Sequence, residues 1–272
     1  MKEYCGNHFI LNGEIKNVEA FDNSLVIKGE SIYEVIRLHK GIPVFFDDHM
    51  ERLVSSVNNQ KKRLMADTGE LKKSILKLAE KEKRKEINIK IVFNYNEDSE
   101  NFLVYYIESN YPTPEQYKKG VKGILFWAER NDPQAKVLNY RLRSAIHQEL
   151  VNEAAYEALL VNSDNLITEG SKSNVFFVNG EGLVTAPDDC ILKGVTRKQI
   201  IDICDVEKID LRFDCVNADD ISGYDAVFIT GTSPMVLPYC CINDEYFNVK
   251  HPLMERLRRI YLERVEESLH KF

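Results

Sequence analysis

The sequence lacks the features that mark several large classes of protein. Its formal net charge is −7, so it has no excess of the positive charge that nucleic-acid and anionic-membrane surfaces require. The densest basic run, "EKEKRKEINIK", alternates with glutamate, which is typical of a solvated helix face. We therefore predict neither a nucleic-acid partner nor a membrane partner.

Long apolar runs and targeting signals are also missing. No uninterrupted apolar stretch approaches the roughly 18 residues of a membrane-spanning helix. The opening residues, "MKEYCGNHFI", contain neither the apolar region nor the small-residue cleavage site of a secretory signal. These absences lead us to expect a cytoplasmic protein.

The six cysteines and six histidines form no metal-binding pattern. There is no Cys-x-x-Cys spacing, and the histidines are scattered along the chain. The adjacent pair Cys240 and Cys241 has a poor geometry for an ordinary disulfide. We expect reduced, mostly packing cysteines and no metal site.

What the sequence does contain is enough apolar material for two packed domains. Its 272 residues are 44% hydrophobic and include 13 Phe and 13 Tyr, with no internal repeat. The best boundary is the polar, proline-containing segment "ESNYPTPEQYKKG". We predict an N-terminal α/β domain over 1–114 and a C-terminal α/β domain over 115–272.

Apolar periodicity places helices and strands in both halves. In the first half we expect mainly strands, with helices over 47–57 and 68–84 and a strand pair over 87–96 and 102–108. In the second half we expect a helix from near Tyr140, along which apolar residues recur at helical spacing, and helices over 196–204 and from Pro252 onward. The expected strands there cover 121–129, 157–163, 173–180, 182–187 and 224–231.

Three stretches have the chemistry of phosphate binding. "LKGVTR" puts Gly194, Val195 and Thr196 at the first turn of a helix, where unpaired N–H groups favour an anion. "FITGTS" ends a strand with Thr232 and Ser233, whose hydroxyls can bind a ligand. Arg52 lies at the edge of an apolar helix face. Each has an ordinary alternative: a helix cap, a strand-end turn and a solvated arginine.

A lysine and a glutamate supply candidate catalytic groups. Lys136 precedes a helix in an apolar, amide-rich stretch, where a lysine can form a Schiff base with an aldehyde. Glu169 occupies a Thr-Glu-Gly-Ser turn at the start of a core strand, where it could equally be a turn residue. Together with a phosphate site they match the needs of pyridoxal phosphate: an imine lysine, an anion cradle and a carboxylate for the pyridine nitrogen.

The order of these motifs resembles a known enzyme family. "GESIYEVIRLHKGIPVFFDDHMERL", "AKVLNY", "EALLVNSDNLITEGSKSNVFFV", "LKGVTR" and "FITGTS" follow one another as in the class IV (fold type IV) pyridoxal phosphate enzymes. These are the branched-chain aminotransferases, the D-amino acid aminotransferases and the aminodeoxychorismate lyases. The resemblance covers nearly the whole chain.

The resemblance implies a two-domain α/β fold with pyridoxal 5'-phosphate in the interdomain cleft, a homodimer, and transfer of an amino group between an amino acid and a 2-keto acid. Lys136 matches the Schiff-base lysine. By the same resemblance, Tyr33 and Ser233 line the substrate pocket, and the cofactor contacts are Arg52, Glu169, Tyr140, Val195, Thr196 and Thr232.

Two rival functions remain open. Aminodeoxychorismate lyase uses the same scaffold, but Glu34 and Val35 stand where its bacterial pattern has threonines. A cofactor-free scaffold is disfavoured because Lys136 and Glu169 are both present. The chain also lacks an arginine in or just after "INIKIVFNYNEDSE", so the residue that binds the substrate carboxylate is open: Arg141, Arg143 or the Thr232–Ser233 backbone could serve.

Overall fold

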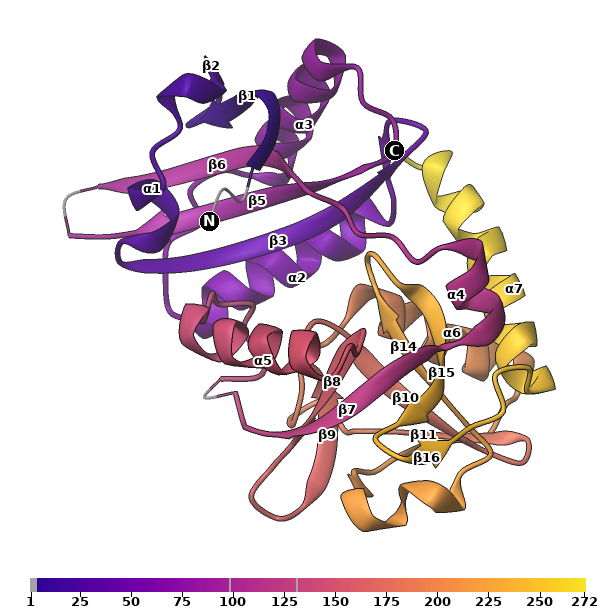
Figure 1. Ribbon diagram of the computed structural model, residues 1–272. Coiled ribbons are helices and arrows are strands. Elements are labelled where there is room, and N and C mark those ends of the chain that lie inside the picture. The colour runs from indigo at the N-terminus through magenta and orange to yellow at the C-terminus, as the bar shows by residue number, and fades with distance from the viewer. Residues whose placement is uncertain (1–3, 98, 131) are drawn as a thin grey trace. The chain divides into compact units, whose positions relative to one another are not determined.

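The computed structural model describes residues 4–97, 99–130 and 132–272 and divides into two compact units (Figure 1). The first unit combines Met1–Asn110, Ala135–Leu138 and Val265–Phe272, and the second combines Tyr111–Gln134 and Asn139–Arg264. Both contain helices and strands, which confirms the predicted mixed α/β fold class. The domain boundary at residues 114 and 115 stays a prediction.

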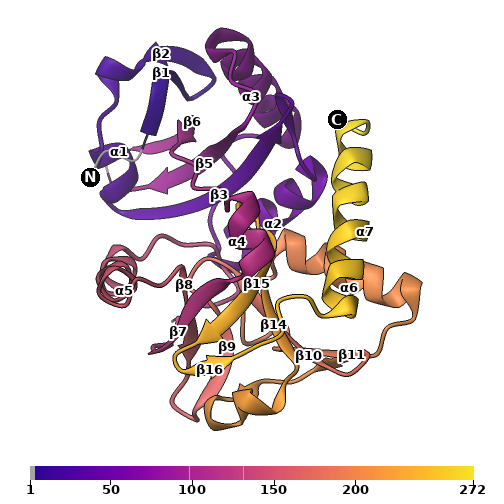
Figure 2. The same ribbon diagram turned by 45° about the vertical axis from the view of Figure 1, so that its right-hand side comes forward.

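An antiparallel sheet forms the centre of the first unit (Figure 2). Among its described residues the strand order is β2-β1-β6-β5-β3-β4. β3 and β5 are paired over their whole common length, from Glu30 opposite Tyr95 to Leu38 opposite Ile87. The strands are β1 (Tyr4–Leu11), β2 (Glu14–Asn17), β3 (Glu30–His39), β4 (Ile42–Pro43), β5 (Ile87–Tyr95) and β6 (Glu100–Ile107).

The helices of the first unit are α1 (Ser24–Ile27), α2 (Phe46–Asn59) and α3 (Thr68–Glu82), with a short 3-10 turn over Val18–Ala20. The two longer helices confirm the predictions over 47–57 and 68–84. α3 begins where Asp67 accepts a hydrogen bond from the Glu70 backbone, as an N-cap aspartate does. The stretch Ser24–Ile27 is helical, although the sequence suggested mainly strands there.

The two faces of this sheet carry different residues because successive side chains of a strand point to opposite sides. One face packs against α2 and α3 through an aliphatic core that includes Ile36, Leu53 and Ile75. The other face carries a cluster of aromatic and apolar residues that includes Tyr33 and Tyr105. Tyr33 and its neighbour Glu34 therefore face opposite sides of β3.

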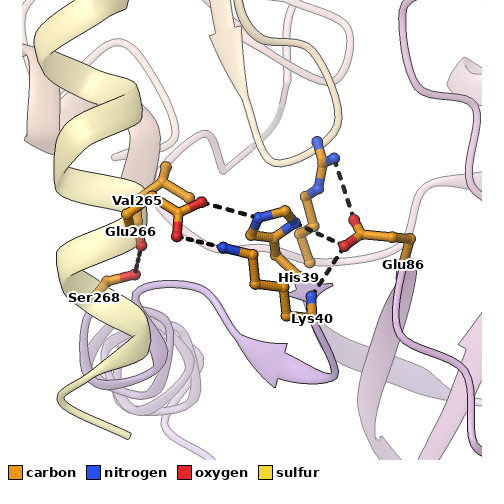
Figure 3. Close-up of polar contacts among 7 residues, drawn as sticks. His39, Lys40, Glu86, Val265, Glu266 and Ser268 are labelled. Carbon is orange, nitrogen blue, oxygen red and sulfur yellow. Dashed lines mark hydrogen bonds and ion pairs between the residues drawn. The ribbon is translucent and has the colours of Figure 1, made fainter.

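Residues at the end of helix α7 contact β3 and the residue after it through polar side chains (Figure 3). His39 Nε2 lies 3.1 Å from Glu266 Oε1, and its Nδ1 lies 2.7 Å from Glu86 Oε1. Lys40 Nζ donates to Glu266 Oε2 at 2.6 Å. Ser268 accepts the Phe45 N–H in the same region. These contacts explain why residues 265–272 belong to the first unit.

A larger sheet forms the second unit (Figure 2). Its described strands run in the order β12-β11-β10-β14-β15-β7-β8-β9-β13, and β16 pairs with β15. The strands are β7 (Val121–Trp127), β8 (Glu157–Val161), β9 (Leu166–Gly170), β10 (Asn174–Asn179), β11 (Gly182–Thr185), β12 (Leu211–Phe213), β13 (Val216–Asn217), β14 (Ala226–Gly231), β15 (Met235–Ile242) and β16 (Glu245–Tyr246).

Four helices and a 3-10 turn accompany this sheet in the described residues: α4 (Pro114–Lys119), α5 (Tyr140–Asn152), α6 (Val195–Glu207), η2 (Ala218–Gly223) and α7 (Pro252–Leu269). α5 begins at Tyr140 as predicted, and the apolar residues that recur at helical spacing there include Leu142, Ile146, Leu150 and Val151. Of those apolar residues only Ile146 is buried, whereas Val151 is 65% exposed, because the helix packs on β7 and β8 through one narrow stripe. No helix of the described residues is long and apolar enough to cross a membrane.

Candidate active site

Lys136 is held by the backbone of β3 in the first unit. The Tyr33 N–H donates to the Lys136 carbonyl at 3.0 Å, and the Leu138 N–H donates to the Ser31 carbonyl at 3.1 Å. The Lys136 N–H also donates to the Ser56 hydroxyl of α2 at 3.3 Å. The lysine therefore lies on a short segment fixed to a sheet edge, although Asn131, in the same predicted loop, lies outside the described residues.

Tyr33 brings two lysine side chains together. Lys136 Nζ lies 5.0 Å from the centre of the Tyr33 ring, and Lys90 Nζ lies 4.8 Å from it. Lys90 is only 1% exposed and also lies 6.0 Å from the centre of the Tyr105 ring. Both ammonium groups are within the range of a favourable cation–π interaction. The aromatic face of the sheet thus carries a buried cation beside the candidate Schiff-base lysine.

Arg52 forms a buried ion pair with Glu34. Arg52 donates from Nε to Glu34 Oε2 at 2.9 Å and from NH2 to Oε1 at 2.6 Å. His49 Nδ1 lies 3.1 Å from Glu34 Oε1, and since a carboxylate only accepts, Nδ1 carries the hydrogen. This bidentate geometry fixes the orientation of the guanidinium of Arg52.

Burial and charge act in opposite directions on the two titratable partners. Burial alone would raise the pKa of Glu34, but the charge of Arg52 and the contact with His49 hold that pKa well below its ordinary value. Burial lowers the pKa of His49, and the Glu34 carboxylate offsets this only in part. At neutral pH the group consists of an ionised Glu34, a charged Arg52 and a neutral His49.

Glu169 lies in the second unit, within strand β9 rather than in the turn that the sequence suggested. It is 3% exposed and accepts hydrogen bonds from Arg130 NH1 at 3.2 Å and from the Leu192 N–H at 3.2 Å. The turn itself begins after Gly170, where Glu157 accepts the hydroxyls of Ser171 and Ser173. The strand continues through Glu169 because pairing with β8 extends to Gly170.

The start of α6 has the features of an anion site. Among the described residues no side chain caps it, and its N-cap is Gly194. A Cβ on Gly194 would come within 1.9 Å of Asn174 Oδ1, so any other residue there would have to displace the Asn174 side chain. Val195 and Thr196 are buried in the first turn, and the Thr196 hydroxyl lies 3.4 Å from the Tyr261 hydroxyl. The N–H groups of this turn are therefore available to an anion.

The other predicted site residues of the second unit lie in the turn between β14 and β15 and at the start of α5. Thr232 and Ser233 follow β14 in the turn that leads to β15, and both are half-buried. Tyr140 is the first residue of α5 and is 40% exposed. Arg141 is exposed and Arg143 half-buried on the same helix. Within each unit, the structure thus groups Lys136 with Tyr33, and Gly194 with Val195 and Thr196.

Three buried or partly buried charged residues were missed as site residues. Glu34 was considered only as a replacement for a threonine, whereas it binds Arg52. Lys90 is the one charged residue of strand β5, a signal that could have marked it. Arg130 contacts Glu169 from the segment after β7, and no sequence pattern indicated that pairing. Among the described residues no cluster of His, Cys, Asp and Glu could hold a metal ion.

Comparison with known proteins identifies the family. The sequence pattern described as amino-transferase class IV matches residues 31–242, which is most of the chain. This chain belongs to the class IV aminotransferase family. The match includes Tyr33, Lys136, Glu169 and the start of α6, and it confirms the resemblance noted in the sequence.

The individual relatives include aminotransferases and an aminodeoxychorismate lyase. The D-alanine aminotransferase of Bacillus licheniformis is 27% identical over 232 residues, covering 80% of each chain. The aminodeoxychorismate lyase of Bacillus subtilis is 22% identical over 269 residues, covering 92% of this chain and 90% of the relative. A solved branched-chain aminotransferase from the archaeon Thermoproteus uzoniensis, with norvaline, superposes with a TM-score of 0.86 at 22% identity, covering 98% and 97% of the two chains. The fold is thus that of the solved class IV enzymes.

Proposed function

We propose that this chain is a pyridoxal 5'-phosphate-dependent aminotransferase that moves an amino group between an amino acid and a 2-keto acid. The observation that carries the proposal is Lys136, an amine fixed by β3 and α2 beside Tyr33, in a chain of the class IV family. Assembly as a homodimer and a cytoplasmic location remain predictions.

The residues present fit the cofactor. The start of α6, which has Gly194 as its N-cap and no side-chain cap among the described residues, suits the 5'-phosphate. Glu169 supplies a buried carboxylate for the pyridine nitrogen, and Arg52 supplies a positive charge oriented by Glu34 for the phosphate. Thr232 offers a further hydroxyl to the phosphate, and Tyr140 a phenol to the ring oxygen. When bound, the cofactor supplies an aldehyde and an electron-accepting ring.

Each proposed residue has a distinct task. Lys136 would hold the cofactor through its side-chain amine, and that amine would move a proton at the Cα of the amino donor. The Glu169 carboxylate would hold a proton on the pyridine nitrogen. Tyr33 packs against the Lys136 side chain and restricts its orientation. Ser233 follows Thr232 and lines the substrate side.

Lys90 is the best candidate for binding the substrate carboxylate. It stands in the strand where the expected arginine is missing, and it shares the Tyr33 ring with Lys136. A buried ammonium group attracts a carboxylate strongly because little water competes for it. Arg141 is exposed, which makes it a poorer candidate.

The geometry of β3 favours transamination over elimination. By the resemblance noted in the sequence, the bacterial lyase pattern has threonines at the positions of Glu34 and Val35. Here Glu34 faces α2 and is occupied by Arg52 and His49, and Val35 has no proton to donate. The similarity to an aminodeoxychorismate lyase therefore reflects shared fold more than shared chemistry.

Borohydride trapping tests whether Lys136 is the lysine that binds the cofactor. The holoenzyme, reduced with borohydride and digested, should carry the phosphopyridoxyl group on the peptide that contains Lys136. Lys136→Ala should still bind the cofactor through its phosphate but should show no covalent label. A label on another lysine in the parent protein would contradict the proposal.

A substrate panel then separates the two chemistries. We expect at least one common amino acid to yield its keto acid with a 2-keto acid acceptor, and little pyruvate from aminodeoxychorismate. A protein that stays colourless with pyridoxal phosphate would instead support the inactive scaffold.

A further inference from the structure

The carboxyl group of Glu169 is held by two donors that come from different segments of the second unit. Arg130 NH1 donates to Glu169 Oε1 at 3.2 Å, and the Leu192 N–H donates to Oε2 at 3.2 Å. Only 4% of the Glu169 side chain and 21% of the Arg130 side chain are exposed. A guanidinium group thus contacts a carboxyl group that is almost closed off from water.

The backbone before Arg130 is fixed to the hairpin of β8 and β9. The Ala128 N–H donates to the Val161 carbonyl at the end of β8, at 3.0 Å. Glu129 Oε1 accepts the N–H of Ser163, in the turn after β8, at 2.6 Å. β8 pairs in turn with β9, the strand that contains the carboxyl group. The guanidinium therefore comes from a segment whose position beside β9 is set by the sheet.

A second arginine of this unit, Arg197 of α6, is bound to other partners. It donates from NH1 to Asp188 Oδ1 at 2.7 Å and from NH2 to the Ala186 carbonyl at 2.8 Å. Arg197 therefore holds the connection between β11 and α6. Arg130 is the arginine that donates a hydrogen bond to Glu169.

We propose that Arg130 is a positioning residue for the pyridine ring of the cofactor and acts through Glu169. This role rests on the proposed function, in which Glu169 holds a proton on the pyridine nitrogen. The last torsion of a glutamate side chain is only weakly restricted, so partners have to fix the plane of its carboxyl group. Arg130 and the Leu192 N–H bind one oxygen each. Because each carboxylate oxygen has two lone pairs, both oxygens keep a site for the ring.

Arg130 also supplies charge at the place where Glu169 needs it. Burial favours the neutral form of a carboxyl group, whereas a positive charge within hydrogen-bond distance favours its charged form. A neutral Glu169 would donate a hydrogen bond to an unprotonated nitrogen instead of accepting one from a protonated nitrogen. Arg130 therefore favours the form of Glu169 that keeps the ring protonated.

Binding of pyridoxine 5'-phosphate to the full chain tests this role without any turnover. This probe has the ring and the phosphate of the cofactor but no aldehyde, and its absorption spectrum reports whether the ring nitrogen is protonated. We expect a protonated ring on the parent protein and a shift toward the unprotonated spectrum on Arg130→Met. Arg130→Lys keeps the charge and should restore part of the parent spectrum. Arg212→Met, at an exposed arginine of β12, is the control and should leave the spectrum unchanged.

A double-mutant cycle with Glu169→Gln tests whether Arg130 acts through Glu169. In the parent background Arg130→Met should lower kcat about tenfold or more while KM for the amino donor changes less, which is the scale of one hydrogen bond to a charged group. In the Glu169→Gln background the same substitution should lower kcat less than about twofold and leave the probe spectrum as it is, because the two residues are coupled. Equal losses in both backgrounds would overturn the proposal, since a residue that only stabilises the fold acts independently of Glu169.

The parent protein separates this role from the proposed function. If the parent transaminates and binds the probe while Arg130→Met has the parent spectrum and kcat, the role of Arg130 alone is overturned. If the parent binds neither pyridoxal phosphate nor the probe, both are overturned. Circular dichroism checks that each variant folds. Arg130→Gln removes the charge but keeps a polar group at this partly exposed position, so it replaces Arg130→Met in the same cycle if that variant does not fold.

Discussion

Glu34 in the first unit and Glu169 in the second are both buried carboxylates in contact with an arginine, but the two contacts differ. Glu34 accepts two hydrogen bonds from Arg52 at 2.6 and 2.9 Å. The Glu169 oxygens lie 3.2 Å from Arg130 NH1 and from the Leu192 backbone. Bidentate pairs of short bonds fix geometry more strongly than longer contacts do.

The difference separates a positioning residue from a residue that acts on the cofactor. Glu34 faces α2, away from Tyr33, and its role is to neutralise and orient Arg52. Glu169 is held near the start of α6 by the Leu192 N–H, which suits a role at the pyridine ring. Substitutions at the two positions should therefore fail in different ways.

The largest effect is expected at Glu169. Glu169→Gln should keep the cofactor bound but lose about three orders of magnitude or more in turnover, since a neutral amide cannot hold the pyridine nitrogen protonated; this is the scale seen when a charged partner that sets a protonation state is neutralised. Steady-state kinetics with cofactor titration measures both quantities. Glu181→Gln, an exposed glutamate of the second unit, is the matched control. Parent-like turnover would make Glu169 a structural residue.

Glu34 should control stability. Glu34→Ala removes the buried carboxylate that binds Arg52 and His49, so the free energy of unfolding should fall by about 3–5 kcal/mol. Urea unfolding followed by circular dichroism measures the change. Glu51→Ala, at an exposed glutamate of α2, the helix that carries Arg52, should change stability little. A loss at Glu34 no larger than that at Glu51 would refute the assignment.

Acid should reduce the stability that the group of Glu34, Arg52 and His49 contributes. A glutamate whose folded pKa is depressed stabilises the protein above its unfolded pKa of about 4.3, and the contribution is lost as pH falls further. The lowered pKa of His49 acts in the same direction below about pH 6.5. The free energy of unfolding should therefore decrease as the pH is lowered from 8 to 3.5. The double variant Glu34→Met, Arg52→Met should lack the decrease in stability below about pH 4.3 that Glu34 causes. A parent protein whose stability stays constant over the whole pH range would contradict this prediction.

Lys90 should give the smallest effect, confined to substrate binding. Lys90→Met keeps the apolar volume but removes the charge, so KM for the amino donor should rise about tenfold or more while kcat changes less. Kinetics with a decarboxylated amine donor provide the internal comparison, because such a donor has no carboxylate to lose. Lys85→Met, at an exposed lysine before β5, is the control. Equal losses for both donors would exclude Lys90 as the carboxylate partner.

The sequence predicted the family, the fold class and most helices, because these depend on local periodicity and on motifs in a fixed order. Strand β9 was not predicted, since its pairing with β8 and β13 involves residues distant in sequence. The exposed Val151 shows the same limit, because periodicity does not indicate how wide a stripe another element covers. The partners of Glu34 and Glu169 also come from other elements, so only the structure reveals them.

A single-turnover half-reaction tests the proposed activity most directly. The holoenzyme is mixed with one equivalent of an amino acid in the absence of a keto acid, and the visible absorbance of the lysine-bound cofactor and the released keto acid are followed together. An aminotransferase should lose that absorbance in proportion to keto acid formed and recover it on addition of a 2-keto acid. Rapid release of pyruvate from aminodeoxychorismate, with no amino acid changing the absorbance, would contradict the assignment and identify a lyase.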